Sequence, residues 1–183
     1  MKNFVVIGGG TISHVRNHLA LCAPAYGTTA KKLDDLFKRK LNIHYAEAYL
    51  REYGYWPANV DFDVQLYLTK MAGGKELETN EDVSILVDKL IADPNTKAII
   101  FNPALVDYNG NITEEGTVGY SWVDNIPTRS GKYEPRLMTS LGKQNMILRP
   151  SEKIIAKIRK ERKDIFLVAF KTTCGATEDE QFL

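Results

Sequence analysis

Phe4-Val5-Val6-Ile7-Gly8-Gly9-Gly10-Thr11 is the stretch that decides the fold. An apolar, β-rich run that enters three glycines and a threonine is typical of a buried parallel strand that delivers the chain to a turn. Because glycine has no Cβ, backbone N–H groups there can approach an anion closely. The stretch predicts a first strand and a phosphate-binding loop, with a tight structural turn as the alternative.

Two better-known phosphate loops do not fit this stretch. No Gly-Lys-Ser/Thr follows the glycines, which excludes a Walker loop. His14 and Val15 stand where the last glycine of a G-x-G-x-x-G fingerprint is needed.

The composition is that of one ordinary globular domain spanning residues 1–183. With 44% apolar and 26% charged residues and a formal net charge of +1, the chain has no field favouring nucleic acid or an anionic membrane. Cys22 and Cys174 lie far apart without a C-x-x-C pair, so neither a zinc knuckle nor a disulfide is indicated. No apolar run approaches a membrane span, and we expect a cytoplasmic protein with no nucleic-acid or membrane partner.

Hydrophobic periodicity places the remaining elements. The chain alternates strand and helix, which predicts an α/β fold: a Rossmann-like three-layer sandwich with a mainly parallel sheet. The expected order is a long loop over 12–29, a helix over 28–40 capped by Thr28 or Thr29, a segment 42–50 left open between strand and helix, a strand over 61–68, a helix over 81–92 capped by Asn80, a buried strand from Lys97, a long flap or β-arm at about 109–142, a helix over 151–162 started by Ser151 and Glu152, and a last buried strand over 164–170.

The strand ends predict where a ligand binds. In open parallel sheets, ligands lie outside the carboxyl ends of the strands, so the exits after Ile7, Leu105 and Phe170 should form one rim. Asn102, Asp107 and Tyr108 follow the central strand and should lie near the glycines. Within the flap, Arg129, Lys132 and Arg136 are candidate anion-binding cations, with a solvated basic loop as the alternative.

Other reactive side chains give weaker signals. His14 and His18 are four residues apart and could share a metal on a helix, but no third ligand is spaced to join them, so no metal site is predicted and a substrate contact is favoured. Cys22 is interpreted as a small buried side chain, with a reactive nucleophile as the less favoured alternative. Trp56 and Trp122 are interpreted as packing residues or rim anchors.

Several separated segments resemble the phosphopantothenoylcysteine synthetases, the carboxy-terminal domain of the bifunctional coenzyme A flavoprotein. That family has Gly-Gly-Thr after its first strand, then Val-Arg, and Ala-Ala-Val-x-Asp-Tyr after a central strand. The similar segments here, in the same order, are Gly9-Gly10-Thr11, Val15-Arg16, Pro103-Ala104-Leu105-Val106-Asp107-Tyr108, Arg136-Leu137-Met138-Thr139-Ser140, Glu152-Lys153-Ile154-Ile155 and Ala169-Phe170-Lys171-Thr172-Thr173.

The resemblance implies a ligase of coenzyme A biosynthesis that uses CTP or ATP and Mg²⁺. Such an enzyme activates the carboxylate of 4′-phosphopantothenate as an acyl-nucleotide, which cysteine then attacks, and homodimers are expected. Carried over residue by residue, the resemblance implies catalytic roles for Asn17, Lys132 and Arg136, and nucleotide or phosphate binding by Gly8, Gly9, Gly10, Thr11, Arg16, Asn102, Ala104, Asp107, Tyr108, Phe170 and Lys171.

The chain departs from the family pattern at three functional positions. Ala20 stands at the spacing of the family's catalytic Asn, which leaves Asn17 as its replacement. Arg136 stands for the flap Lys, and Thr173 for a Glu. These losses motivate a second hypothesis, a non-catalytic nucleotide-binding sensor or sequestering protein. A third is chemistry on a nucleotide glycosidic bond, suggested by acids such as Asp107.

Overall fold

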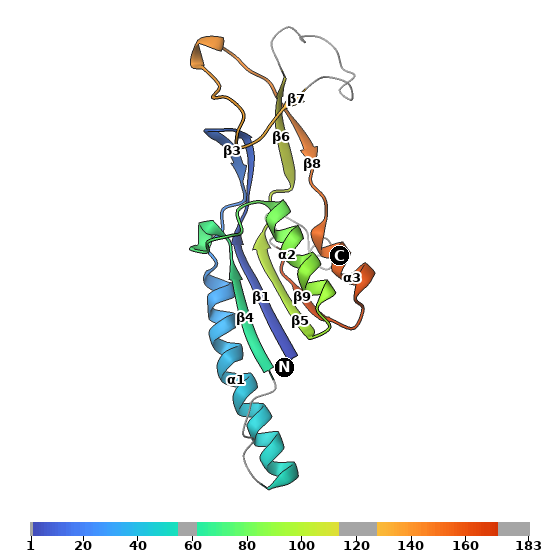
Figure 1. The fold of residues 1–183 in the computed structure, drawn as a ribbon. Coiled ribbons are helices and arrows are strands. Elements are labelled where there is room, and N and C mark those ends of the chain that lie inside the picture. The colour runs from blue at the N-terminus through green and yellow to red at the C-terminus, as the bar shows by residue number, and fades with distance from the viewer. Residues whose placement is uncertain (1, 55–61, 114–127, 172–183) are drawn as a thin grey trace, which may run out of the picture.

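A four-stranded parallel sheet forms the centre of the molecule. The computed structural model describes residues 2–54, 62–113 and 128–171. The sheet contains β1 (Lys2–Gly10), β4 (Phe62–Leu68), β5 (Thr96–Ala104) and β9 (Phe166–Ala169) in the order β4-β1-β5-β9 (Figure 1). The exits of β1, β5 and β9 therefore lie side by side, as the strand ends predict. The last strand is not buried, because it is a sheet edge where Phe166 is 63% exposed.

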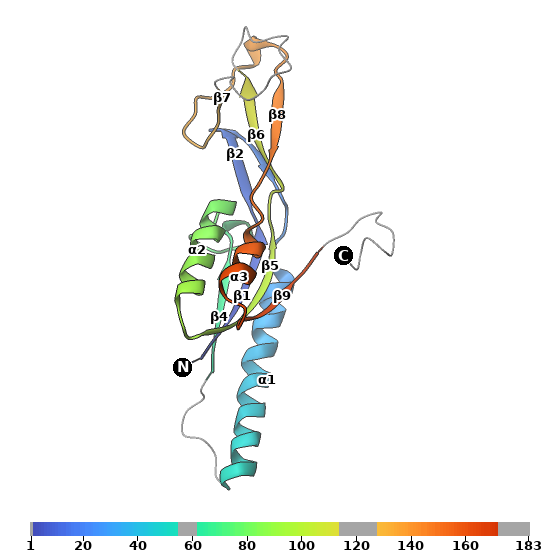
Figure 2. The same ribbon diagram turned by 90° about the vertical axis from the view of Figure 1, so that its right-hand side faces the viewer.

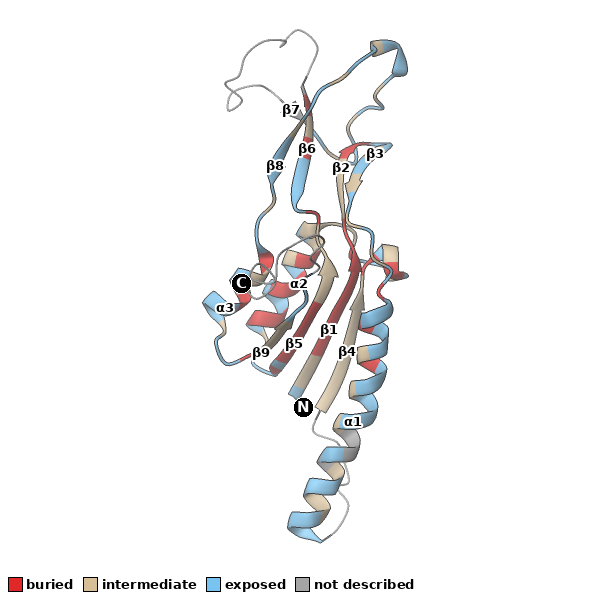
Figure 3. Ribbon diagram, turned by 180° about the vertical axis from the view of Figure 1, so that it is seen from behind, coloured by how far each residue is buried: buried red, intermediate tan, exposed pale blue. Residues whose placement is uncertain are grey.

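Helices cover both faces of this sheet and make three layers (Figure 2). One face packs on α1 (Thr28–Tyr53), with Val6 and Ile100 against Ala30. The other packs on α2 (Asn80–Ala92) and α3 (Ile154–Glu161), with Ile7 and Ile99 in the larger core cluster. Because β1 and β5 are covered on both faces, they read as continuous apolar runs and form the buried centre (Figure 3). The Rossmann-like α/β prediction is confirmed.

Beyond the sheet, the chain forms a β-arm (Figure 1). One part is the hairpin of β2 (Ile12–Arg16) and β3 (Leu19–Cys22); the other is an antiparallel sheet in the order β7-β6-β8, from β6 (Tyr108–Thr113), β7 (Thr128–Arg129) and β8 (Met146–Pro150). The predicted β-arm is present in the described part of 109–142, whereas 114–127 lie outside it.

The long loop expected over 12–29 is wrong. Val15 of β2 is fully buried, and a Cβ at Gly110 of β6 would press on Val15 and Leu21. A glycine on β6 therefore lets the hairpin lie flat on the arm sheet. This packing partner is distant in the sequence, and the residues of β2 and β3 are partly polar. The local sequence therefore did not indicate that they form two strands.

The helices differ from their predictions mainly at their ends. α1 runs on through 42–50 to Tyr53, which settles the open segment as helix, and its second half extends past the sheet (Figure 1). Thr79, not Asn80, caps α2 through a capping box with Asp82. α3 begins only at Ile154, so the predicted start at 151–152 is wrong. The described residues also contain two short 3-10 helices, η1 (Lys70–Ala72) and η3 (Thr139–Leu141). No helix in the described residues is long and apolar enough to span a membrane.

Candidate functional site

The three glycines belong to the strand rather than to a turn. Gly8, Gly9 and Gly10 pair with Asn102, Pro103 and Ala104 of β5 as the last residues of β1. A Cβ at Gly8 would overlap Ala30 of α1, and a Cβ at Gly10 would overlap the Ala23 carbonyl oxygen. The Gly10 N–H donates to the Ala25 oxygen at 2.7 Å. The glycines thus bring α1 and its entry segment tightly onto β1, and the predicted turn at this place is corrected to a strand.

Directly after β1, the side chain of Thr11 takes part in a buried network of hydrogen bonds. Its hydroxyl donates to Asn80 Oδ1 at 2.6 Å and accepts from the Val106 N–H at 3.0 Å. Asn80 Nδ2 donates in turn to the Val106 oxygen at 2.7 Å. Thr11 is fully buried. Its side chain therefore links the ends of β1 and β5 to the start of α2. The hydrogen bonds of its hydroxyl are made within the protein.

A cavity of about 1000 Å³, the first cavity, opens at the carboxyl ends of β1, β5 and β9. This is the rim at which parallel sheets bind ligands. It is lined by Gly9, Ala25, Tyr26, Gly27, Thr28, Thr29, Asn80, 101–107, 151–155 and 169–171. Among the predicted binding residues, the first cavity brings together Gly9, Asn102, Ala104, Asp107, Phe170 and Lys171.

The N-terminus of α1 faces the first cavity without a cap. Gly27 is the N-cap residue, at φ 70°, and Thr28 and Thr29 form no side-chain cap, contrary to the prediction. The first turn contains no acidic residue. The first N–H groups of a helix lack intrahelical partners and carry positive partial charge, which attracts anions. Sequence reasoning missed this feature; Gly27 before an acid-free first turn was the available signal.

Charged side chains at the first cavity are balanced. Lys153 lies 3.1 Å from Asp107, and both side chains are mostly exposed. Lys171 adds a cation at the end of β9. The charges near the uncapped helix N-terminus therefore partly compensate one another. Asn102 of β5 adds a neutral side chain that can both donate and accept hydrogen bonds.

A second cavity of about 860 Å³ lies on the other side of Asn80 and Ser151, between α2 and the arm. It is lined by 12–14, 78–82, Ser84, Ile85, Asn109, 131–133, Ser151, Glu152 and Ile154. Four residues line both cavities: Asn80, Ser151, Glu152 and Ile154. The two spaces are therefore direct neighbours.

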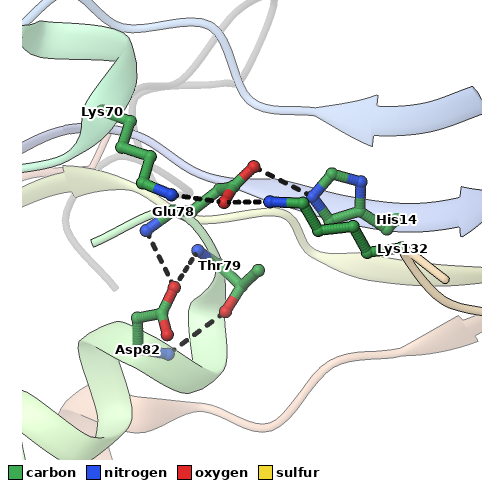
Figure 4. A network of polar contacts seen from close by, with 6 residues as sticks. All are labelled: His14, Lys70, Glu78, Thr79, Asp82 and Lys132. Carbon is green, nitrogen blue, oxygen red and sulfur yellow. Dashed lines mark hydrogen bonds and ion pairs between the residues drawn. The ribbon is translucent and has the colours of Figure 1, made fainter. Parts of the chain in front are cut away.

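Glu78 holds a cluster of cationic and polar groups at the second cavity (Figure 4). Its Oε2 accepts from Lys70 Nζ and from Lys132 Nζ, each at 2.8 Å, and its Oε1 lies 3.1 Å from His14 Nε2. Hydrogen bonds from Lys132 and then Lys70 lower the pKa of Glu78 to about 2, against a smaller opposing effect of burial. The same contact raises the pKa of Lys132. Through these contacts the Glu78 carboxylate connects the arm, which supplies His14 and Lys132, with η1, which supplies Lys70.

The chain shares its fold with the DNA/pantothenate metabolism flavoprotein from Streptococcus pneumoniae. The two structures superpose with a TM-score of 0.66 at 19% sequence identity, over 98% of this chain and 73% of that one. At this identity the match shows a related fold. No family model matches the chain, and no curated protein sequence is detectably similar to it.

The three predicted catalytic residues lie away from the first cavity. Lys132 lines the second cavity instead. Asn17 is exposed in the turn after β2, where its N–H donates to the Glu134 oxygen at 3.1 Å, and Arg136 is exposed in the arm. The predicted binding residues Arg16 and Tyr108 also lie in the arm, where Arg16 is buried and Tyr108 begins β6. Gly8, Gly10 and Thr11 lie at the end of β1 without lining either cavity.

The structure also places the two histidines and the cysteine that the sequence singled out. His14 and His18 lie on the hairpin and its turn, not on a helix. Within the described ranges, no group of three or more His, Cys, Asp or Glu side chains could hold a metal ion. Cys22 is exposed, so the expectation of a buried side chain is wrong. Cys174, Trp56, Trp122 and Thr173 lie outside the described residues, as does the side chain of Arg129.

Proposed function

We propose that the protein is a nucleotide-dependent ligase that activates a carboxylate with CTP or ATP in the first cavity. The observation that carries this proposal is the uncapped, acid-free N-terminus of α1 at a cavity on the carboxyl rim of the sheet. Backbone N–H groups at a helix start bind phosphate oxygens well. Nothing in the first turn of α1 competes with a phosphate for them.

The same geometry favours the transition state of nucleotidyl transfer. Pyrophosphate gains negative charge as it leaves, so donors and cations fixed at its position lower the barrier more than they aid ground-state binding. The α1 N-terminus and Lys171 supply such groups. Mg²⁺ is held mainly by phosphate oxygens with one or two carboxylates, and Asp107 and Glu152 are the carboxylates of the first cavity.

We infer the finer reaction from the motif resemblance. The carboxylate would be that of a phosphopantothenate-like metabolite, the acceptor would be cysteine, and the enzyme would work in the cytoplasm as a single-domain homodimer. The structural neighbour is a DNA/pantothenate metabolism flavoprotein, which is consistent with this choice of substrate. The collinear motifs, rather than the cavity, support this choice of substrate.

Nucleotide binding is the first test. The melting temperature is measured with and without CTP, ATP, GTP or UTP, in the presence and absence of Mg²⁺. The proteins compared are the native chain, Asn102→Ala and Asn111→Ala. Both asparagines are half-buried strand residues, but only Asn102 lines the first cavity. A ligand at a hundred times its Kd adds about 2.7 kcal/mol of stability. We expect CTP or ATP to stabilise the native chain and Asn111→Ala, and to do so less for Asn102→Ala. Absence of stabilisation by every triphosphate contradicts the proposal.

A non-catalytic nucleotide-binding protein is the second candidate. It is favoured by one observation: Asn17, Lys132 and Arg136, the residues assigned to catalysis, do not line the first cavity. Pyrophosphate release with phosphopantothenate, cysteine and Mg²⁺ separates the two candidates. Triphosphate binding without release supports the sensor or sequestering role, and release supports the ligase.

A further inference from the structure

We propose that Tyr26 is the stacking platform for the nucleobase at the first cavity. The inference rests on the proposed function, because it places the base of the nucleotide whose phosphates bind the N-terminus of α1. It goes further by assigning the base to a side chain that the motif resemblance does not assign. Its basis is an exposed aromatic ring, carried by a fixed backbone, in the lining of the first cavity.

The aromatic ring of Tyr26 has no partner in the described part of the chain. Tyr26 is 69% exposed although it lines the first cavity. It makes no hydrogen bond and no ring contact with any residue that the structure describes. Its neighbours in the sequence, Ala25 and Gly27, are too small to cover it. An open aromatic face beside a cavity gains apolar contact when a flat ligand covers it.

The backbone that carries Tyr26 is fixed on both sides. On one side, the Ala25 oxygen accepts from the Gly10 N–H at 2.7 Å. On the other side, a Cβ at Gly27 would lie only 2.8 Å from the Ala72 Cβ, so the start of α1 packs tightly on η1. Because the backbone is fixed, a ligand has to order only the two side-chain torsions of the tyrosine, which keeps the entropy cost of binding small.

Tyr26 lies directly beside the proposed phosphate site. Its Cα is about 3.8 Å from that of Gly27, the N-cap residue of α1, and the helix N–H groups proposed to bind the phosphates follow at once. In a nucleotide only the ribose separates the base from the first phosphate. A ring that begins one residue before the phosphate site is therefore within the span of one bound nucleotide.

Phe170 is the alternative platform at the first cavity. It is 50% exposed and follows β9. A Cβ at Gly27 would lie 3.8 Å from the Gly9 nitrogen of β1 and 3.1 Å from Leu68 Cδ2 of β4, so the start of α1 lies at the other end of the sheet. Neighbouring strands are about 4.8 Å apart, which puts β9 about 10 Å from β1. Tyr26 is therefore the aromatic residue closer to the proposed phosphate site.

Stacking on Tyr26 supplies affinity without choosing the base. Every base has a π-face, and removal of an aromatic platform weakens binding by about fivefold to a hundredfold. The hydrogen-bonding edge of the base is not read by such a contact. Tyr26 should therefore contribute equally to the binding of CTP and of ATP.

The test compares nucleotides with a ligand that has the phosphates but no base. The Kd values of CTP, ATP and inorganic tripolyphosphate, each with Mg²⁺, are measured by calorimetry on the native chain and its variants. We expect Tyr26→Ala to weaken CTP and ATP binding by about fivefold to a hundredfold, and to leave that of tripolyphosphate within about twofold. Tyr26→Phe keeps the ring and should leave all three Kd values within about twofold.

A matched control and a contact measurement localise the effect. Tyr133→Ala removes a tyrosine that is 94% exposed in the arm and does not line the first cavity, so it should change none of the three affinities. In the native chain with bound nucleotide, nuclear Overhauser effects are expected between the base protons and the ring protons of Tyr26. The ring signals are assigned by their loss in Tyr26→Ala.

The outcomes separate this inference from the proposed function. If CTP and ATP bind Tyr26→Ala as tightly as the native chain, or if only Phe170→Ala weakens them, the platform is overturned while the nucleotide site stands. The platform also fails if Tyr26→Ala weakens tripolyphosphate as much as the nucleotides, or if Tyr26→Phe loses as much affinity as Tyr26→Ala. If none of the three ligands binds the native chain, the proposed function is overturned and this inference falls with it.

Discussion

Glu78 couples the stability of the fold to pH. Its pKa falls from 4.5 to about 2 because Lys132, Lys70 and His14 favour the charged form. A carboxyl whose folded pKa is lowered stabilises the fold at pH above its unfolded pKa, and this contribution disappears as pH falls from about 4.5 to about 2. We predict that Glu78→Gln lowers the free energy of unfolding by about 1–2 kcal/mol at neutral pH, because solvent screens the half-exposed lysines.

The measurement is urea unfolding of both proteins across this acid range. The difference between native chain and Glu78→Gln should shrink toward zero as the pH approaches 2, and should also shrink at high salt. Glu76→Gln is the control, since Glu76 is exposed and pairs with no residue the structure describes. A pH-independent difference would mean that Glu78 acts through packing rather than through its charge.

Residue chemistry alone predicted part of the site. Asn102 and Asp107 follow an apolar strand, so the rule for parallel sheets placed them at the rim, whereas Tyr108, placed by the same rule, begins β6 of the arm. The triple glycine was misinterpreted because a glycine in a phosphate turn and a glycine under a close helix look the same in sequence. Which one applies depends on Ala30 of α1, whose approach only the folded chain reveals.

At the scale of elements, the phosphate site proposed at the N-terminus of α1 opposes the stability of the helix itself. An acidic residue in the first turn of a helix stabilises it by about 0.3–1 kcal/mol, but repels a bound phosphate. Thr28 is exposed and lines the first cavity. We predict that Thr28→Asp raises the melting temperature of the free protein and weakens CTP or ATP binding at least tenfold.

Thermal unfolding with and without nucleotide measures both effects on one sample. Thr28→Asn is the matched control: it has nearly the same shape without the charge, and should leave nucleotide affinity within a few-fold of the native chain. If Thr28→Asp stabilises the protein and nucleotide affinity is unchanged, the phosphates do not lie at this helix.

The elements predicted best are those with a long apolar pattern, either periodic, as in α2 and β4, or continuous, as in β1 and β5. α2 and the strands β1, β4 and β5 were predicted near their observed bounds because their apolar pattern records the core directly. The hairpin of β2 and β3 was missed because its support, Gly110 of β6, comes from a distant part of the chain. The second half of α1 was left open because it extends beyond the sheet, where no core imposes a pattern.

At the scale of the molecule, the arm and the sheet share their backbone and their polar anchors. β1 runs into β2 through Thr11, and β5 leads into β6 through Val106, with both junctions bonded to Asn80. Glu78 adds a tie from the arm to η1. Such continuity argues that the described parts unfold together rather than as two units.

Paired core substitutions test this cooperativity. Ile99 lies in the sheet and Ile112 in the arm, and both are almost fully buried. Replacing either by Val should cost about 1 kcal/mol. In one cooperative unit, Ile112→Val lowers the hydrogen-exchange protection of sheet amides such as that of Ile100 as much as it lowers that of arm amides. Ile85→Val is the control, because Ile85 is 48% exposed and should change neither. Protection lost in the arm alone would make the arm a separate folding unit, able to open over the two cavities while the sheet stays folded.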